Sequence, residues 1–399
     1  MPCRPLSRLV ALLLLLLLNA CSSDNQANSP SDPGAGGVLF AVSGEALALS
    51  GYAFPPLNPG DPAFVDGWQL TFSHLLVTID HLTLSSNPDI SAGDQSLTGA
   101  VVAGVDGPWA LDLSHSDPSY LPGKGGPDEE AVPIASLAAQ NRNGNAPFAT
   151  DGTRYAFGFD TVAATASALK VNLDASALSA YQTMIQSGCI VDYIGTATFR
   201  GGTVEGHTDC NDDPEHANWP KTVNFELCFK SPTSYRNCQN PDNSNATPLG
   251  NDEFQRGIAP LAEKSVIAQV TLHTDHPFWD SVLHDSPAHF DQFAARVSDQ
   301  TGTPTVTLEM TQGVDYTAVT DAAGKPLDWR YCIDPPTDVH GQFNGQMAFD
   351  PGSVPHAPDN QAAHGLRDYY DFSTYDQSTQ GHLNSDGLCY VSRNYPSPN

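Results

Sequence analysis

A nineteen-residue stretch, residues 273–291, brings together four histidines and four aspartates. It reads His273-Thr-Asp275-His276-Pro-Phe-Trp279-Asp280-Ser-Val-Leu-His284-Asp285-Ser-Pro-Ala-His289-Phe-Asp291. Neutral imidazole nitrogens and ionised carboxylate oxygens bind zinc, copper, iron or manganese when several of them converge at about 2.0 to 2.2 Å from one ion. The stretch therefore predicts a metal site, and it is the strongest indication of chemistry in the chain.

The expected ligands are the histidines of this stretch together with one neighbouring carboxylate. We expect His273, His276 and His284 to bind the ion, with His289 as a further candidate. Asp275 or Asp285 would supply an oxygen ligand or the acceptor that orients an imidazole. More distant histidines in loop-like sequence can join the set: His207, His216, His340, His356, His364 and His382. Zinc is expected ahead of copper, because the set has neither thiolate nor thioether.

The same residues have a structural explanation. Aspartate and histidine are common in loops, so Asp285 before Ser-Pro can form an Asx turn, and His276 can simply stack on Trp279. Two further histidines, His74 and His81, lie on otherwise apolar strands. Because His74 continues the alternation of Trp68, Leu70 and Phe72, we expect it to be a core histidine rather than a ligand.

Two resemblances accompany the His/Asp stretch. His273-Thr-Asp275-His276 resembles the second half of the His-x-His-x-Asp-His motif of the metallo-β-lactamase family, in which these residues are zinc ligands of hydrolases. Thr271 stands where that family has its first histidine, and the β-rich sequence does not fit the family's layered α/β fold, so we treat the likeness as coincidental. Asp66-Gly67-Trp68 with His-x-Asp-His-Pro-Phe-Trp resembles uncharacterised secreted bacterial lipoproteins, which imply no activity.

The N-terminal residues predict export. Arg4 and Arg8 precede an apolar run, 9–18, that has the length of a signal-peptide core and is too short to span a bilayer. The run ends in Leu18-Asn19-Ala20-Cys21, which resembles the bacterial lipobox, so residues 1–20 would be removed and Cys21 would carry palmitate-like acyl chains. Ser22 after the cysteine favours the outer membrane, on its periplasmic or cell-surface face. Residues 21–37 are expected to form a flexible tether.

Charge limits the range of partners. The chain has 17 Lys and Arg against 45 Asp and Glu, a formal net charge of -28. Such a surface repels nucleic-acid phosphates, so nucleic-acid binding is excluded. Calcium in acidic loops is an alternative to transition metal. The segment Asn240-Pro-Asp242-Asn243-Ser-Asn245 is the best candidate for it, although solvated turns explain most aspartates equally well.

Six cysteines remain after the signal and the lipidation site are set aside: Cys189, Cys210, Cys228, Cys238, Cys332 and Cys389. An even number in an exported chain indicates disulfides. Residues 189–199 and 223–229 both read as strands, and a hairpin between them would pair Cys189 with Cys228. The pairing of the other four stays open, with Cys332 and Cys389 left to tie down the C-terminal region.

The alternating pattern predicts a mainly β fold, an antiparallel β-sandwich with long loops and a few short helices over residues 38–399, in one large domain or two. Strands are expected around Trp68, Trp109 and Tyr155 and over 266–272. One helix is predicted with Asp174 as N-cap and Gly188 past its end, and a second from near Pro287 to Val297. The His/Asp stretch would then leave the end of the 266–272 strand.

These observations leave three classes of function open. The first is a lipid-anchored protein that binds zinc or copper for storage, delivery or structure. The second is a metal-dependent hydrolase with Asp280 or Asp285 as base, in which the aromatic residues Tyr369, Tyr370, Phe372 and Tyr375 line a cleft or, as we expect, pack as a tail. The third is a disulfide-stapled adhesion or scaffold module. A protein or glycan partner is not indicated by any motif.

Overall fold

The computed structural model describes residues 27–138, 148–201, 210, 216–243, 254–333, 345–356 and 365–394. Residues 1–26, which include the predicted signal peptide and Cys21, lie outside this range. The fold is mainly β, with two sheets and a few short helices, as the alternating pattern predicted. Among the described residues, no helix combines the length and the apolarity that crossing a bilayer requires.

The smaller sheet has six strands in the order β15-β14-β12-β1-β6-β5. Their bounds are β1 (Val38–Ser43), β5 (Leu121–Pro122), β6 (Glu130–Leu137), β12 (Val266–Leu272), β14 (Gly381–Leu383) and β15 (Gly387–Leu388).

The larger sheet has ten strands, seven of which follow the order β13-β10-β9-β2-β7-β11-β16, while β3 and β4 pair with β2 and β8 pairs with β4. Their bounds are β2 (Trp68–Ser85), β3 (Val101–Val105), β4 (Trp109–Asp112), β7 (Ala156–Thr161), β8 (Leu169–Lys170), β9 (Val191–Phe199), β10 (Thr222–Phe229), β11 (Thr233–Arg236), β13 (Thr305–Thr307) and β16 (Tyr390–Arg393).

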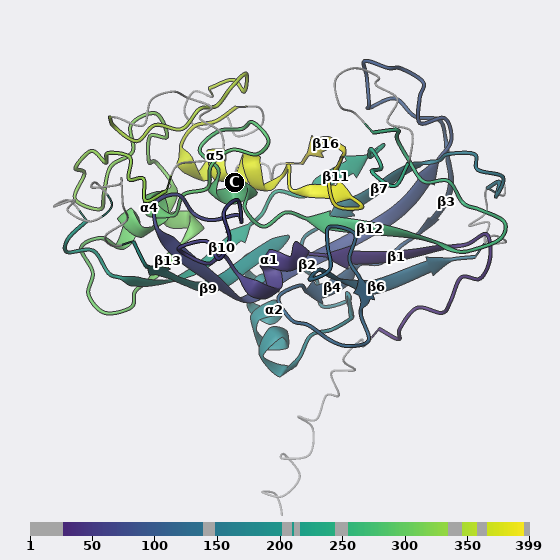
Figure 1. Ribbon diagram of the computed structural model, residues 1–399, viewed down its shortest axis with the longest axis horizontal. Helices are drawn as coiled ribbons and strands as arrows, with labels where there is room; N and C mark the ends of the chain where they lie inside the picture. Colours follow the sequence, from purple (N-terminus) through teal and green to yellow (C-terminus); the bar gives the residue numbers. More distant parts are fainter. Residues whose placement is uncertain are drawn as a thin grey trace, which may run out of the picture.

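The helices are short and lie around the sheets (Figure 1). They are α1 (Glu45–Ser50), α2 (Ala175–Ser187), α4 (Asp291–Ala294) and α5 (Tyr369–Gln377), with 3₁₀ helices η1 (His276–Phe278), η2 (Ala295–Val297) and η3 (Leu308–Thr311).

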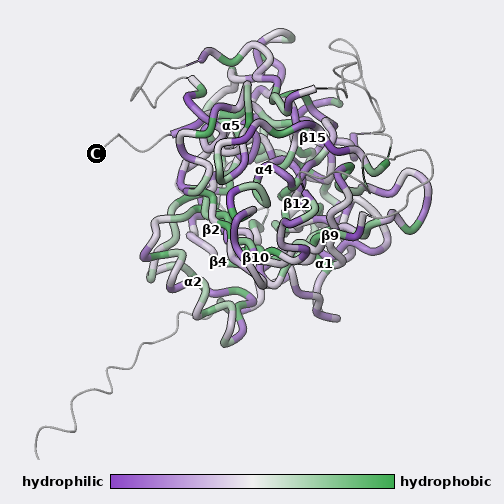
Figure 2. Tube along the Cα trace, turned by 90° about the vertical axis from the view of Figure 1, so that its left-hand side faces the viewer, coloured by the Kyte–Doolittle hydropathy of each residue, from purple (hydrophilic) through white to green (hydrophobic). Residues whose placement is uncertain are grey.

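The main core lies between the two sheets, so the architecture is sandwich-like. Phe40 of β1 and Phe157 of β7 stack with ring centroids 6.0 Å apart, which joins the two layers. Figure 2 shows hydrophobic segments gathered along the strands and hydrophilic ones in the surrounding loops. Three strand pairs are parallel, β1 with β12, β10 with β13 and β4 with β8, a departure from the purely antiparallel sheet that was expected.

A β-bulge in β2 changes which face its side chains occupy. The pairing with β9 shifts between Phe72 and His74, so one extra residue, Ser73, is inserted. Before the bulge Trp68 and Leu70 face the main core, and after it Leu75 and Val77 do. His74 therefore does not continue the core face as expected. It shares the opposite face with Leu76, which packs in a smaller core under α2.

The helix predicted after Asp174 is confirmed. The carboxylate of Asp174 accepts hydrogen bonds from the backbone N–H groups of Ser176 and Ala177, both at 2.8 Å, and Gly188 ends the helix in the left-handed conformation. The second predicted helix is too long. Residues 288–290 form a β-bridge and loop, because Ala288 pairs with Trp279 and Phe64, so helical structure begins only at Asp291.

The six cysteines form three disulfides. Cys189 pairs with Cys228, as the two strands predicted. The other two, Cys210–Cys332 and Cys238–Cys389, join residues 122 and 151 positions apart. The Cys238–Cys389 bond ties the segment that carries β14, β15 and β16 to the end of β11.

The described part of the predicted tether, residues 27–37, runs along the domain. The backbone N–H of Ala27 donates to Lys170 O at 2.8 Å, and that of Gly36 donates to Lys264 O at 3.0 Å. Whether residues 38–399 form one folding domain or two stays a prediction.

The buried carboxyl group of Asp192 should make stability depend on pH. Asp192 lies opposite Leu76 and Cys228 under α2, and burial, followed by the charges of Glu226 and Glu309, raises its pKa to about 7. A raised pKa means that the folded state holds the proton more tightly, so this contribution to stability is present below about pH 4 and is lost as the pH rises through 7.

We expect Asp192→Asn to be more stabilising at pH 8 than at pH 4. The change that it causes in the free energy of unfolding should be more favourable at pH 8 by about 1 to 3 kcal/mol. Urea unfolding of both proteins across this range measures it. Equal effects at the two pH values would contradict the assignment.

Candidate metal centre

Four histidines converge at the end of β12. His273, His276, His284 and His382 each place one ring nitrogen so that all four atoms lie within 4.8 Å of one another. The ring centroids of His273 and His382 are 4.0 Å apart, and those of His276 and His284 are 5.8 Å apart. Four imidazole nitrogens at this spacing match the donor set of a tetrahedral transition-metal site.

Strand pairing sets the positions of two of these histidines. His273 follows the last residue of β12, and its backbone N–H donates to Gln380 O at 3.0 Å. In the adjacent strand β14, His382 lies opposite Thr271. This strand begins with Gly381, where a Cβ atom would lie 2.5 Å from the ring of Tyr235 in β11, so glycine lets β14 pack closely against the larger sheet. The sheet thus joins residues more than a hundred positions apart.

The helix η1 holds the third histidine. Pro277 and Phe278 turn the chain directly after β12, and Ser373 of α5 donates to Pro277 O at 2.9 Å. His276 stacks on Trp279 with ring centroids 3.7 Å apart, and its Nδ1 lies 2.6 Å from Thr379 Oγ1. The ring is therefore held on one face and at one nitrogen, which leaves Nε2 for the centre of the group.

The central nitrogens are buried and make no well-aligned hydrogen bond among the described residues. Among the described residues, neither Nε2 of His276 nor either ring nitrogen of His382 has a hydrogen-bond partner in good geometry. Burial, and then the neighbouring histidines, hold the pKa of both rings well below the usual value, so both are neutral. A neutral, buried and unpartnered imidazole nitrogen is costly unless something accepts its lone pair. A metal ion is such an acceptor.

His284 is the accessible member of the group. It lies on the turn that returns from η1, and its side chain is 38% exposed. Its Nδ1 is 3.0 Å from a carboxylate oxygen of Asp285, whose φ of 63° lies in the left-handed region. Three histidines therefore come from packed elements, while the fourth comes from a surface turn.

The structure does not bring His289 into this group. His289 is fully buried elsewhere, with Nε2 3.4 Å from Asp280 Oδ2 and its ring against Trp329. The reason is the β-bridge at Ala288, which holds the chain extended where a helix was expected and turns the next side chain into a separate polar pocket.

The two proposed carboxylates take different positions. Asp275 is buried beside the histidines; burial raises its pKa, and the charges of His273 and His284 oppose that shift. Asp285 is exposed and faces His284. Neither belongs to the converging set, so both are neighbours of the four imidazoles.

The distant histidines divide into three groups. His382 joins the site, which no local sequence pattern indicated. His216 packs edge to face against Trp219, and His356 lies against Tyr316, so both belong to other parts of the fold. His207, His340 and His364 lie outside the described residues.

Acidic cavities flank the histidine group. One of about 400 Å³ includes Asp275 and Asp285 in its lining. A larger one of about 980 Å³ is lined by Glu45, Glu129 and Asp386, among others. Glu45 Oε1 lies 3.7 Å from His273 Nδ1, which connects the larger cavity to the site. Burial raises the pKa of Glu45 well above its usual value, so the exposed carboxylates Asp285 and Asp386 carry the negative charge that raises the local concentration of cations.

Two other sequence hypotheses concern Asp242 and the aromatic residues of α5. The carboxylate of Asp242 is 2.6 Å from Lys124 Nζ and accepts a hydrogen bond from Asn384, so the segment around it, as far as it is described, bonds to the protein itself. Asn245 lies outside the described residues. The aromatic residues of α5 pack in or against the core, with Tyr369 and Phe372 fully buried.

Comparison with known protein families, curated proteins and solved structures gave no significant match.

The Cys238–Cys389 disulfide should support the site, because it anchors the segment that carries His382. We expect Cys238→Ser with Cys389→Ser to weaken zinc binding about tenfold, equivalent to about 1.4 kcal/mol, and to speed amide hydrogen exchange in β14. Titration with a zinc indicator and exchange mass spectrometry measure the two effects.

The matched control removes Cys189–Cys228, which lies under α2 on the other side of the larger sheet. It should cost about 2 to 5 kcal/mol of stability and leave zinc affinity unchanged. Equal zinc affinities for the two double variants, both folded, would contradict a supporting role for Cys238–Cys389.

Proposed function

We propose that this chain is an exported, lipid-anchored protein that binds one transition-metal ion through His273, His276, His284 and His382. The observation that carries the proposal is the convergence of four ring nitrogens within 4.8 Å, three of their rings being buried. Zinc is the preferred ion and copper the second, because four neutral nitrogens and no sulfur suit a borderline cation. Storage, delivery or a structural role are the uses that fit such a site.

The uneven burial of the ligands favours storage or delivery. An ion held by three packed histidines keeps its position while the exposed His284 leaves and returns. Loading and release would then need only the movement of a surface turn. The acidic cavities beside the site and the net charge of -28 supply cations to it.

The hydrolase alternative requires an open coordination position. Catalytic zinc sites keep three protein ligands and a water, whereas four protein ligands fill a tetrahedral shell. The four-histidine arrangement therefore favours binding. Hydrolysis becomes the better explanation only if His284 stays away from the bound ion, which X-ray absorption spectroscopy of the zinc form would detect as three nitrogen ligands and one oxygen.

The lipid anchor rests on Leu18-Asn19-Ala20-Cys21. We expect Cys21→Ala to abolish incorporation of labelled palmitate and to release the protein from the membrane fraction, because the acyl chains are the proposed anchor. The three disulfides suit an oxidising compartment. Unchanged membrane association of the Cys21→Ala variant would reject the anchor.

Metal binding is tested by the ion content of the protein. After dialysis against micromolar zinc and then buffer, we expect wild type to retain about one ion per chain. His273→Ala with His276→Ala should retain none, because it removes two of the four ligands. Elemental analysis gives the ratio, and His356→Ala, a histidine outside the site, is the matched control. Wild type without bound metal would overturn the proposal.

Melting experiments separate this function from a scaffold role. Ligand saturation at a hundredfold excess over the dissociation constant stabilises the folded state by about 2.7 kcal/mol. Chelation should therefore lower Tm and zinc should restore it, whereas a disulfide-stapled scaffold would respond to reductant alone.

A further inference from the structure

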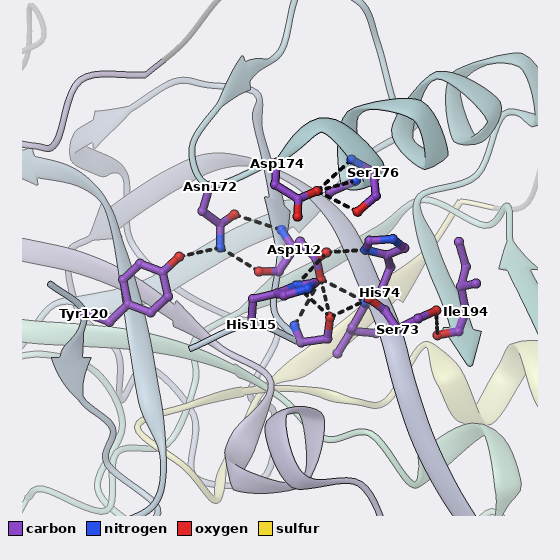
Figure 3. Close-up of polar contacts among 12 residues, drawn as sticks. Ser73, His74, Asp112, His115, Tyr120, Asn172, Asp174, Ser176 and Ile194 are labelled. Atoms are coloured by element: carbon purple, nitrogen blue, oxygen red, sulfur yellow. Dashed lines mark hydrogen bonds and ion pairs between the residues drawn. The ribbon is translucent and has the colours of Figure 1, made fainter. Parts of the chain in front are cut away.

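A second group of metal-binding side chains lies on the opposite face of the larger sheet. His74 of β2, Asp112 at the end of β4 and His115 place their ligand atoms within 4.8 Å of one another. Asp112 Oδ2 lies 2.6 Å from His74 Nδ1 and 3.1 Å from His115 Nδ1 (Figure 3). One carboxylate oxygen thus faces two imidazole nitrogens.

The carboxylate at the centre is held rigidly. The side chain of Asp112 is fully buried, and its Oδ1 accepts hydrogen bonds from the backbone of Leu75 at 3.1 Å and from the backbone and hydroxyl of Ser114 at 3.1 and 2.8 Å. Asn172 bonds to both backbone groups of Asp112 at 2.9 and 2.6 Å. These contacts occupy one oxygen and leave the other directed at the imidazoles.

The β-bulge in β2 creates this group. Without the extra residue, His74 would share the core face of Trp68 and Leu70; with it, the ring faces Asp112 instead. The side chain of His74 is 12% exposed and that of His115 is 47% exposed, so the group is open to solvent on the His115 side. Asp174 adds a carboxylate near His115. Hydrogen bonds from Ala177 and Ser176, and then the charge of His115, lower the pKa of Asp174.

We propose that His74, Asp112 and His115 form a second site for a borderline divalent cation such as Zn²⁺ or Cu²⁺. Two imidazoles and one carboxylate are a common donor set for these ions and a poor one for Ca²⁺ or Mg²⁺, which select oxygen ligands. Binding replaces the two imidazole contacts to Asp112 by bonds to the ion, and each Nδ1 that donates to the carboxylate gives up its proton to solvent while Nε2 takes one up, so the rings stay neutral. Oδ2 of Asp112, at 2.6 and 3.1 Å from the two nitrogens, needs to move only slightly to reach about 3.3 Å from each, the ligand spacing of a tetrahedral ion at about 2.0 Å.

The two sites would differ in occupancy. Three protein ligands with an open side hold an ion less tightly than four imidazoles of which three are buried, and solvent completes the coordination. The second site would therefore fill at higher metal concentration and exchange quickly. It does not depend on the four-histidine group, which lies beyond β12 on the other sheet.

The test counts copper ions and identifies their ligands. Wild type titrated with Cu²⁺ should bind two equivalents, the second more weakly. In His115→Ala, an exposed position that leaves the core intact, we expect the second equivalent to bind at least about tenfold more weakly. In the electron paramagnetic resonance spectrum, the second copper ion should show hyperfine coupling to one nitrogen in this variant and to two nitrogens in wild type. His276→Ala should lose the first equivalent and keep the second.

His81→Ala is the matched control. His81 is 50% exposed, its Nδ1 is 2.9 Å from Asp160 Oδ2, and its own neighbouring group contains one imidazole and two carboxylates. The second equivalent should persist in this variant. The proposal is overturned if wild type takes up one equivalent only, or if His115→Ala binds the second equivalent as tightly as wild type does.

Discussion

The antiparallel pairing of β12 with β14 holds the four-histidine group together. It sets His382 opposite Thr271 and beside His273, although the two strands are separated by more than a hundred residues. Gly381 lets β14 pack closely against Tyr235 of the larger sheet, and the Cys238–Cys389 disulfide anchors the segment that follows. The helix η1 then adds His276 from the same end of β12, supported by α5. The three buried histidines of the group therefore all depend on this end of the β12–β14 pair.

The same arrangement has an energetic cost. A buried polar atom without a partner costs about 1 to 3 kcal/mol, and the group contains three such nitrogens among the described residues. Packing against Trp279 and the bond to Thr379 orient His276 without satisfying its Nε2. A bound ion would offset the cost at two of these atoms, Nε2 of His276 and one ring nitrogen of His382. This cost supports the proposal of a metal site at the four-histidine group.

The two candidate metal-binding groups are built differently. In the four-histidine group, buried rings meet at a strand edge and a surface turn completes the set. In the group of His74, Asp112 and His115, a single buried carboxylate is fixed by backbone donors and two rings approach it from the surface. The first construction excludes water from most ligands, and the second leaves one side open. Affinity and exchange rate should differ accordingly.

Local sequence patterns predicted the β-rich fold, the helix between Asp174 and Gly188, and the concentration of candidate ligands between His273 and His284. These features depend on alternation, capping residues and residue chemistry, which are properties of neighbouring positions. Pairings between distant segments carry no such local signal. The place of His382, the separation of His289 and the pairing of Cys210 with Cys332 follow from strand register and from a β-bridge. The bulge that turns His74 toward Asp112 adds a single residue to the alternation of β2. The position at which the side chains change faces is visible only in the pairing of β2 with β9.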